Sequence, residues 1–224
     1  MRSADLTTAA RIRDAAIAQF GRHGFGTGLR AIADAAGVSA ALVIHHFGSK
    51  AGLRAACDDF VLELIRDSKT EALVGMSPAT WFAQLGAIES YAPVMAYLVR
   101  SLQSGGQLAK TLLRRMIDSA QGYLEEAVRA GTVKASRDPA ARAKFLAVNN
   151  AGGFVLYLQM HDNPTDLAAV LRDYARDMVL PALEIYTFGL MADPSMYDAF
   201  AVRGEATHTA AARGDADDDP ASIY

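Results

Sequence analysis

The sequence predicts an all-α protein with a small N-terminal head and a larger helical body. Apolar residues recur at helical spacing along most of the chain. Glycines and prolines separate these periodic segments, and no segment shows the strict alternation of apolar and polar residues that is typical of a strand. A chain of 224 residues with 51% hydrophobic residues is long and apolar enough to bury a full core.

The first fifty residues are expected to form a helix-turn-helix. A first helix over about residues 8–22 ends in the glycine-rich "RHGFGTG". A second helix ends at Gly37, and Ser39 is placed to cap a third helix of about two turns. A fourth, longer helix starts at its own cap, Ser49. Two short helices joined by a tight glycine turn are the arrangement that this motif requires.

The charge of the chain is unevenly distributed. The net charge is −3, yet residues 1–50 hold six Lys and Arg side chains against three Asp. The head therefore carries a charge of +3, and the rest of the chain carries −6. This distribution places the search for an anionic partner at the head.

The third predicted helix has an unusual outer face. Val43 and Phe47 are expected to point into the head's core, which leaves Leu42 and Ile44 outside. In the major groove of DNA, alanine and leucine can contact thymine methyl groups, and histidine can donate to phosphates or base edges. This helix is therefore interpreted as a DNA-reading helix whose outward residues are Ala40, Ala41, Leu42, Ile44, His45 and His46.

The head resembles a known family in its motifs. "ARIRDAAIAQFGRHGF" and "LRAIADAAGVSAALVIHHFGSKAGL" are similar to the DNA-binding head of the tetracycline-repressor (TetR) family over about residues 9–55. The resemblance implies an all-helical homodimeric repressor with a three-helix head and a ligand-sensing, dimerising body. The overall run resembles actinobacterial members that control drug-efflux transporter genes.

The resemblance also implies roles for individual residues. Thr27 resembles the threonine that caps the second helix, and Lys50 resembles a lysine that faces phosphate. Two positions depart from the pattern: Ile44 stands where a phosphate-contacting tyrosine is usual, and Ala41 stands where glycine is common. The expected DNA-binding set is Thr27, Arg30, Ser39, Ala40, Ala41, Leu42, Ile44, His45, His46 and Lys50.

The body carries aromatic and methionine side chains on its predicted helices. Such side chains line adaptable pockets for flat, apolar or cationic drugs, although they are also common in protein cores. Asn149 and Asn150 interrupt an apolar helix, and buried asparagines need a ligand, a neighbouring helix or a dimer mate as partner. The expected ligand-binding set is Trp81, Tyr91, Met95, Met116, Tyr123, Asn149, Asn150, Phe154 and Tyr157.

The last two long helices, about 139–160 and 165–189, are the candidates for a dimer interface. The final helix shows a continuous apolar stripe, which either packs against a second copy or belongs to the core of one chain. A dimer would place two heads on half-sites of a palindromic operator about 34–36 Å apart, or a multiple of that spacing. The expected interface set is Gly152, Leu156, Leu167, Val170, Leu171, Tyr174 and Met178.

Several classes of protein are disfavoured by the sequence. No apolar run approaches the ~20 residues of a membrane helix, no signal peptide is evident, and the single Cys57 suits a reducing cytoplasm. His45 and His46 are adjacent on a helix and make poor joint metal ligands. No HExxH, GxSxG or paired-cysteine motif is present, so neither an enzyme nor a cofactor is expected.

Together these features predict a ligand-responsive, cytoplasmic repressor of a multidrug efflux transporter gene. The expected organisation is a head over residues 1–48, a body over 49–203 and a disordered acidic tail over 204–224. Its partners are operator DNA, a small apolar or cationic inducer and a second copy, without a membrane. Two alternatives are an activator or architectural protein that has no ligand, and a sensor or enzyme with a vestigial head.

Overall fold

The computed structural model describes residues 8–75 and 77–202, and these residues form helices and loops without a strand. The all-α prediction is therefore confirmed for this part of the chain. The elements are α1 (Thr8–His23), α2 (Leu29–Ala36), α3 (Ala40–Phe47), α4 (Lys50–Val74), α5 (Pro78–Gly86), η2 (Ile88–Tyr91), α6 (Ala92–Gln103), α7 (Gly106–Arg129), α8 (Pro139–Met160) and α9 (Leu167–Phe188).

The chain divides into two compact units between Asp177 and Met178, a point that lies inside α9. The described part of the second unit holds the rest of α9, including Pro181, and a further helical segment over residues 195–202. The predicted acidic tail, residues 204–224, lies outside the described residues. None of the helices in the described ranges combines the length and the apolar character needed to span a membrane.

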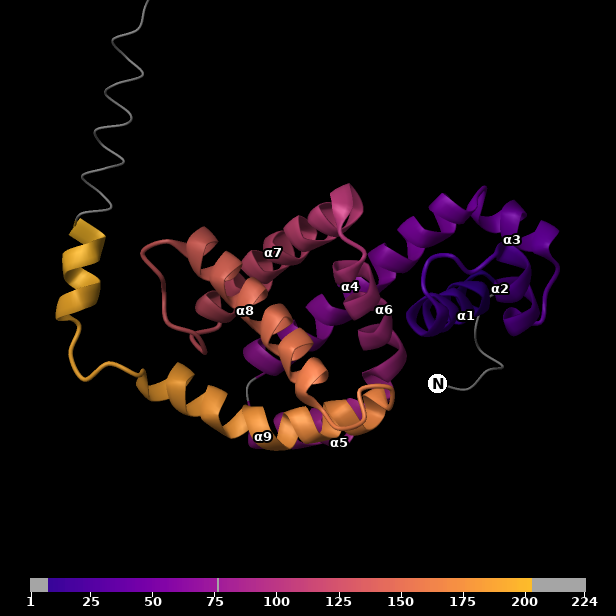
Figure 1. Ribbon diagram of the computed structural model, residues 1–224. Helices are drawn as coiled ribbons and strands as arrows, with labels where there is room; N and C mark the ends of the chain where they lie inside the picture. The colour runs from indigo at the N-terminus through magenta and orange to yellow at the C-terminus, as the bar shows by residue number, and fades with distance from the viewer. Residues whose placement is uncertain (1–7, 76, 203–224) are drawn as a thin grey trace, which may run out of the picture. The chain divides into compact units, whose positions relative to one another are not determined.

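Helices α1 to α3 form the head, drawn in indigo in Figure 1. Ile12 and Phe20 of α1, Ile32 of α2 and Val43 of α3 are fully or almost fully buried in one shared core. Leu53 of α4 joins the same core. The orientation of α3 is therefore set by apolar contacts on one side, and α4 is continuous with the head.

The turns of the head are built as the sequence predicts. Gly37 follows α2 with a positive φ of 66°, a conformation that residues with a Cβ rarely adopt. Ser39 caps α3 by accepting the N–H of Leu42 at 3.2 Å, and Ser49 caps α4 by accepting the N–H of Gly52 at 3.0 Å. These caps determine where α3 begins and where the chain turns into α4.

The body of the first unit is held together by three apolar clusters. The first cluster joins α4, α6 and α7 through Leu62, Leu98 and Leu112. The second joins α7 and α8 through Ala120, Leu124, Ala143 and Ala147. The third joins α6, α8 and the first half of α9 through Val99, Phe154, Val170 and Leu171. Helix α7 contributes to two of the clusters and packs against α4 and α8 (Figure 1).

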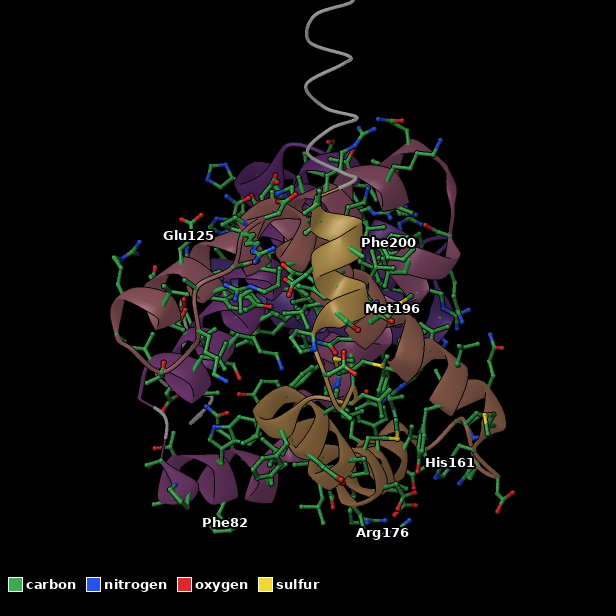
Figure 2. All side chains as sticks on the ribbon, turned by 90° about the vertical axis from the view of Figure 1, so that its left-hand side faces the viewer. Phe82, Glu125, His161, Arg176, Met196 and Phe200 are labelled. Atoms are coloured by element: carbon green, nitrogen blue, oxygen red, sulfur yellow. The ribbon has the colours of Figure 1, made fainter. Side chains whose placement is uncertain are left out.

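Helix α5 is the least buried helix of this unit. None of its residues is buried, and Phe82 is 71% exposed and points away from the rest of the unit (Figure 2). Side-chain hydrogen bonds attach α5 to α4: the Trp81 indole N–H donates to the carbonyl of Ala72 at 2.9 Å, and the Gln84 amide donates to the carbonyl of Ser68 at 3.4 Å. Hydrogen bonds thus attach α5 to the body, whereas buried apolar side chains attach the other helices.

The closest approach between head and body is the crossing of α1 and α6. A Cβ atom added to Gly21 would lie 2.9 Å from the Cβ of Ala96 and 2.9 Å from the backbone nitrogen of Tyr97. Glycine in α1 and alanine in α6 therefore let the two backbones nearly touch. Through this crossing, a body helix is seated directly on the first helix of the head.

Replacing Gly21 by alanine is expected to destabilise the fold by about 1–3 kcal/mol, because α1 and α6 must separate to admit the new methyl group. The matched control is Gly122→Ala in α7, where a Cβ meets nothing within 4 Å. That control is expected to stabilise the protein by about 0.5–1 kcal/mol through helix propensity. Urea unfolding followed by circular dichroism measures both, and equal effects would contradict the close crossing.

Candidate nucleic-acid interface

Helix α3 presents an exposed face opposite its buried one. Val43 is 1% exposed, and Phe47 and Ala40 are half-buried against the head's core. Ala41 and His45 lie one helical turn apart on the opposite side and are exposed. The flanks of this outer face are formed by Leu42, which is half-buried, and by Ile44 and His46, which are exposed.

The structure places the remaining predicted DNA-binding residues around α3. Arg30 is exposed on α2, and Lys50 is the first residue of α4, directly after the turn that follows α3. The Ser39 hydroxyl is already engaged as the N-cap of α3. Ser39, Lys50 and the outer face of α3 are thereby brought together in one short stretch of chain.

Thr27 has a different local role from the one implied by the resemblance. The N-cap of α2 is Gly28, without a side-chain cap, and the Thr27 hydroxyl donates to the carbonyl of Gly24 at 2.8 Å. Thr27 therefore closes the loop between α1 and α2. The physical reason is that the helix begins one residue later than a threonine cap requires.

A buried hydrogen bond joins α4 to α6 behind the head. The Tyr97 hydroxyl donates to Oδ1 of Asp58 at 2.6 Å and lies 3.3 Å from the carbonyl of Arg54. The Arg54 guanidinium lies 3.5 Å from the centroid of the Phe25 ring, and Phe25 meets Tyr97 edge-on at 5.6 Å. Loop, α4 and α6 are thus connected through one cluster of side chains.

In this cluster, burial and hydrogen bonding have opposite effects on the pKa of Asp58. Burial raises the pKa of the Asp58 carboxyl, while the hydrogen bond from Tyr97 and the Arg54 charge work to lower it. The neighbouring Cys57 is fully buried, and burial raises the pKa of its thiol to about 12. Cys57 therefore stays a neutral core side chain, as a structural role requires.

The predicted ligand-binding residues are distributed over the apolar clusters of the body. Tyr91 and Met95 pack at the α6–α8–α9 cluster, Met116 packs near Leu98, and Tyr123 packs at the α7–α8 cluster. Phe154 is 4% exposed and belongs to the core of the chain. Trp81 is half-buried on α5. These residues therefore lie in one domain but in separate clusters.

Asn149 and Asn150 are not buried in the single chain, so no neighbouring helix of the same chain covers them. Both are exposed on α8, and the Asn149 amide donates to the carbonyl of Phe145 in its own helix at 2.9 Å. The reason is the rotation of α8, which directs Ala147 and Phe154 inward. Neither asparagine faces the apolar clusters.

The predicted dimer residues separate into two groups. Leu167, Val170, Leu171 and Tyr174 pack within the chain's own α6–α8–α9 cluster, so the core alternative applies to that part of the stripe. Gly152 and Leu156 are exposed on α8, and Met178 opens the second unit. The exposed α8 residues lie beside two large apolar side chains that the sequence reading did not single out, Phe145 and Val148.

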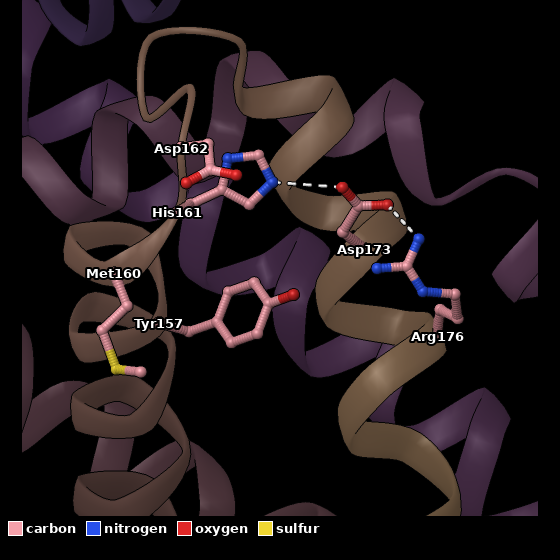
Figure 3. A pocket seen from close by; sticks show the side chains of 6 residues that line it. All are labelled: Tyr157, Met160, His161, Asp162, Asp173 and Arg176. Atoms are coloured by element: carbon pink, nitrogen blue, oxygen red, sulfur yellow. Dashed lines mark hydrogen bonds and ion pairs between the residues drawn. The ribbon is translucent and has the colours of Figure 1, made fainter.

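A polar cluster that the sequence reading missed lies at the turn between α8 and α9. It surrounds a hollow of about 260 Å³ lined by Tyr157, Met160, His161, Asp162, Asp173 and Arg176 (Figure 3). His161 accepts the N–H of Asn163 at Nδ1, 3.1 Å away, and its Nε2 lies 3.1 Å from Asp173. In the neutral ring, Nε2 therefore carries the proton and donates to Asp173.

The same cluster continues along α9. Arg176 donates to Asp173 at 2.7 Å and to Asp177 at 2.8 Å, and the Tyr157 hydroxyl donates to Asp177 at 2.6 Å. The hydrogen bond from His161, with the Arg176 charge, lowers the pKa of Asp173, and the bonds from Arg176 and Tyr157 lower that of Asp177. The bond to Asp177 raises the pKa of Tyr157 to about 12. Because both carboxylates already have donors, the cluster fastens α8 to α9. Within the described residues, no group of three His, Cys, Asp or Glu is placed to hold a metal ion.

A three-helix head that buries one side of its third helix and exposes the other, joined to a helical body, is the arrangement of a helix-turn-helix DNA-binding regulator. Residues 12–57 match the family described as bacterial regulatory proteins, tetR family, and residues 89–192 match the tetracyclin repressor-like, C-terminal domain. The chain is 72% identical over 209 residues to the HTH-type transcriptional regulatory protein RaaS of Mycobacterium tuberculosis (strain ATCC 25618 / H37Rv), covering 92% of this chain and 99% of that protein. The chain belongs to the TetR family of transcriptional regulators.

Solved structures share the fold at low sequence identity. A TetR-family transcriptional regulator from Rhodococcus sp. has a TM-score of 0.51 and 19% identity, over 76% of this chain and 98% of that one. A TetR-family regulator from Pectobacterium atrosepticum has a TM-score of 0.48 and 20% identity, over 84% and 95%. At this identity, the Rhodococcus structure bears on the fold alone.

Replacing Tyr97 by phenylalanine is expected to lower the free energy of unfolding by about 1–3 kcal/mol, because Asp58 loses its donor inside the protein. The loss is expected to be larger at pH 7 than at pH 4. Without the donor, the pKa of Asp58 rises further above its unfolded value, and stability falls as pH rises through that window. Chemical unfolding at both pH values tests this.

The matched control is Tyr91→Phe, since the half-buried Tyr91 hydroxyl has no hydrogen bond recorded in the structure. It is expected to change stability by less than about 0.5 kcal/mol at either pH. A pH-independent loss in Tyr97→Phe would contradict the assigned role of Asp58.

Proposed function

We propose that this protein is a homodimeric repressor that binds a palindromic operator through α3 and releases it when a small molecule binds the body. The observation that supports it most is the outward face of α3, where Ala41, Ile44 and His45 are exposed above a fully buried core. A helix held so firmly on one side and so exposed on the other is suited to insertion into a major groove.

Phosphate contacts are proposed to position this helix. Lys50 begins α4 just after α3 ends, and Arg30 is exposed on α2. Their cationic side chains contribute a salt-dependent attraction to the DNA backbone that is independent of sequence. His45 and His46 complete the set that we propose meets phosphates or base edges.

Dimerisation is proposed to use the exposed apolar face of α8. Phe145 is 63% exposed, Val148 43% and Leu156 61%, and Gly152 lies between them along the helix. A row of large apolar side chains around a glycine allows another helix to approach closely. A two-fold dimer places two heads on one operator, because a single small head buries too little DNA surface for specific affinity.

The release of DNA is proposed to follow from the joint between head and body. Helix α6 contacts the head at the Gly21–Ala96 crossing, α4 reaches the head's core through Leu53, and the Tyr97–Asp58 bond joins the two helices. A ligand that binds more tightly to a second arrangement of α4 and α6 therefore moves the two heads out of register with the half-sites of the operator. A coupling of about 1–3 kcal/mol between ligand and DNA changes affinity about 5- to 150-fold.

The regulated gene is proposed to encode a multidrug efflux transporter, and the inducer is proposed to be an apolar or cationic drug-like molecule acting in the cytoplasm. Support comes from the resemblance of the overall sequence to actinobacterial efflux regulators and from the half-buried aromatic and methionine side chains of the body. Gel-shift assays on the DNA beside the gene test this assignment.

Two alternatives predict different results in the same assay. An activator or architectural protein without a ligand keeps its affinity for DNA throughout a broad compound titration. A sensor or enzyme with a vestigial head binds no fragment from its own genomic neighbourhood. The exposed face of α3 favours a working head over a vestigial one.

Lys50→Ala is expected to weaken binding to all DNA sequences alike and to reduce the slope of log K against log salt by about 1. His46→Ala is expected to weaken binding across sequences as well. Fluorescence anisotropy at several salt concentrations measures both effects. The control is Lys110→Ala, an exposed lysine of α7 in the body. A change in a single base preference would show that the phosphate assignment is wrong.

Leu156→Asp is expected to convert the dimer into monomers, since it places a charge in the middle of the apolar α8 face. Sedimentation velocity measures the distribution of species. Leu108→Asp is the control, because Leu108 is 58% exposed on α7, away from that face. A dimer that survives Leu156→Asp would place the interface elsewhere.

Trp81 is expected to report ligand binding, because it is the only tryptophan of the chain and is half-buried on the lightly packed α5. A cationic dye such as ethidium is expected to change its emission and to reduce operator affinity over the same concentration range. If the dye binds but leaves operator affinity unchanged, it is not an inducer.

A further inference from the structure

We propose that α3 reads the 5-methyl groups of thymine and that Ile44 is the specificity-determining side chain. The inference rests on the proposed DNA-binding function and goes further, since it names the chemical group that is read. It predicts operator half-sites whose recognition depends on thymine methyl groups facing the major groove.

The side chains of α3 exclude the common hydrogen-bonding modes of base reading. Residues 40–47 read AALVIHHF and contain no Arg, Lys, Asn, Gln, Asp or Glu. Bidentate recognition of guanine by Arg or Lys, and of adenine by Asn or Gln, is therefore absent from this helix. Ser39 precedes α3 and accepts the N–H of Leu42 as its N-cap, and within α3 itself the two histidines are the polar side chains.

The apolar side chains of the outer face have one matching group on DNA. Among the groups that base pairs present in the major groove, the thymine methyl is the apolar one. Ala41 is small and lets the helix backbone approach the bases, while Ile44 extends further from the same face. Ile44 is 50% exposed although its neighbour Val43 is 1% exposed, so the exposed aliphatic surface has no role in the head's core.

The shape of isoleucine suits this task. A β-branched side chain in a helix has one strongly preferred χ1 rotamer, so Ile44 loses little conformational freedom when it meets a base. Its position is fixed by Val43 and Phe47, which anchor α3 in the core on the other side. Ile44 is thus a preorganised apolar contact on a helix that has few polar ones.

The test uses the full chain and the tightest 30-bp duplex selected from a random library. Each thymine is replaced in turn by deoxyuridine, which keeps base pairing and removes the methyl group. At one or more positions in each half-site, the dissociation constant is expected to rise about fourfold, the factor that burial of one methyl-sized group provides. Changing the same thymine to cytosine is expected to weaken binding, and 5-methylcytosine at that position is expected to recover part of the loss.

Ile44→Ala identifies the residue that makes the contact. This variant is expected to bind the thymine and deoxyuridine duplexes equally well, with unchanged thermal stability because Ile44 is exposed. The matched control is Leu108→Ala, an equal truncation of an exposed leucine in α7, which is expected to keep the full deoxyuridine effect.

The possible failures are distinguishable. If no thymine is sensitive to loss of its methyl group, methyl reading by α3 is wrong while DNA binding stands. If Ile44→Ala retains the deoxyuridine effect, the contact belongs to another residue and the assignment to Ile44 is overturned. If selection enriches no duplex at all, the proposed function itself fails.

Discussion

The close crossing of α1 and α6 is the constraint on which the rest of the structure depends. Gly21 and Ala96 remove the side-chain bulk that would otherwise hold the helices apart, and Tyr97 then reaches Asp58 on α4. Because Leu53 of α4 also lies in the head's core, both body helices that touch the head are fastened to it. Under the proposed ligand control, this attachment would couple a change in α4 and α6 to the position of the head.

The exposed face of α3, which we propose to read DNA, is a consequence of burial on its opposite side. Val43 and Phe47 hold α3 by apolar contacts, and the caps at Ser39 and Ser49 limit it to two turns. Because the orientation of α3 is fixed in this way, it determines which side chains of this two-turn helix point away from the core. The composition of α3 is the basis for our proposal that it reads methyl groups more than hydrogen-bonding groups.

The body divides its polar and apolar contacts between different tasks. Apolar clusters join α4, α6, α7, α8 and the first half of α9, and the turn between α8 and α9 is fastened in addition by the His161–Asp173 and Tyr157–Asp177 bonds. These hydrogen bonds favour one geometry at the turn, although the groups that make them are half-buried or exposed. The apolar row on α8 stays exposed in the single chain and is the surface that we propose for dimerisation.

The sequence by itself determined the helices of the head, the serine caps of α3 and α4 and the exposure of Ala41, Ile44, His45 and His46, because helical periodicity and glycine or serine signals act over a few neighbouring residues. It did not determine that Ala40 packs against the core or that Thr27 leaves α2 uncapped. It did not reveal that Asn149 is exposed, that Val170 and Leu171 serve the chain's own core, or that Tyr97 bonds Asp58 39 residues away. An apolar stripe indicates that one face of a helix is buried. Which surface covers that face depends on the rotation and packing of whole helices. Contacts between distant segments were therefore decided by the tertiary structure alone.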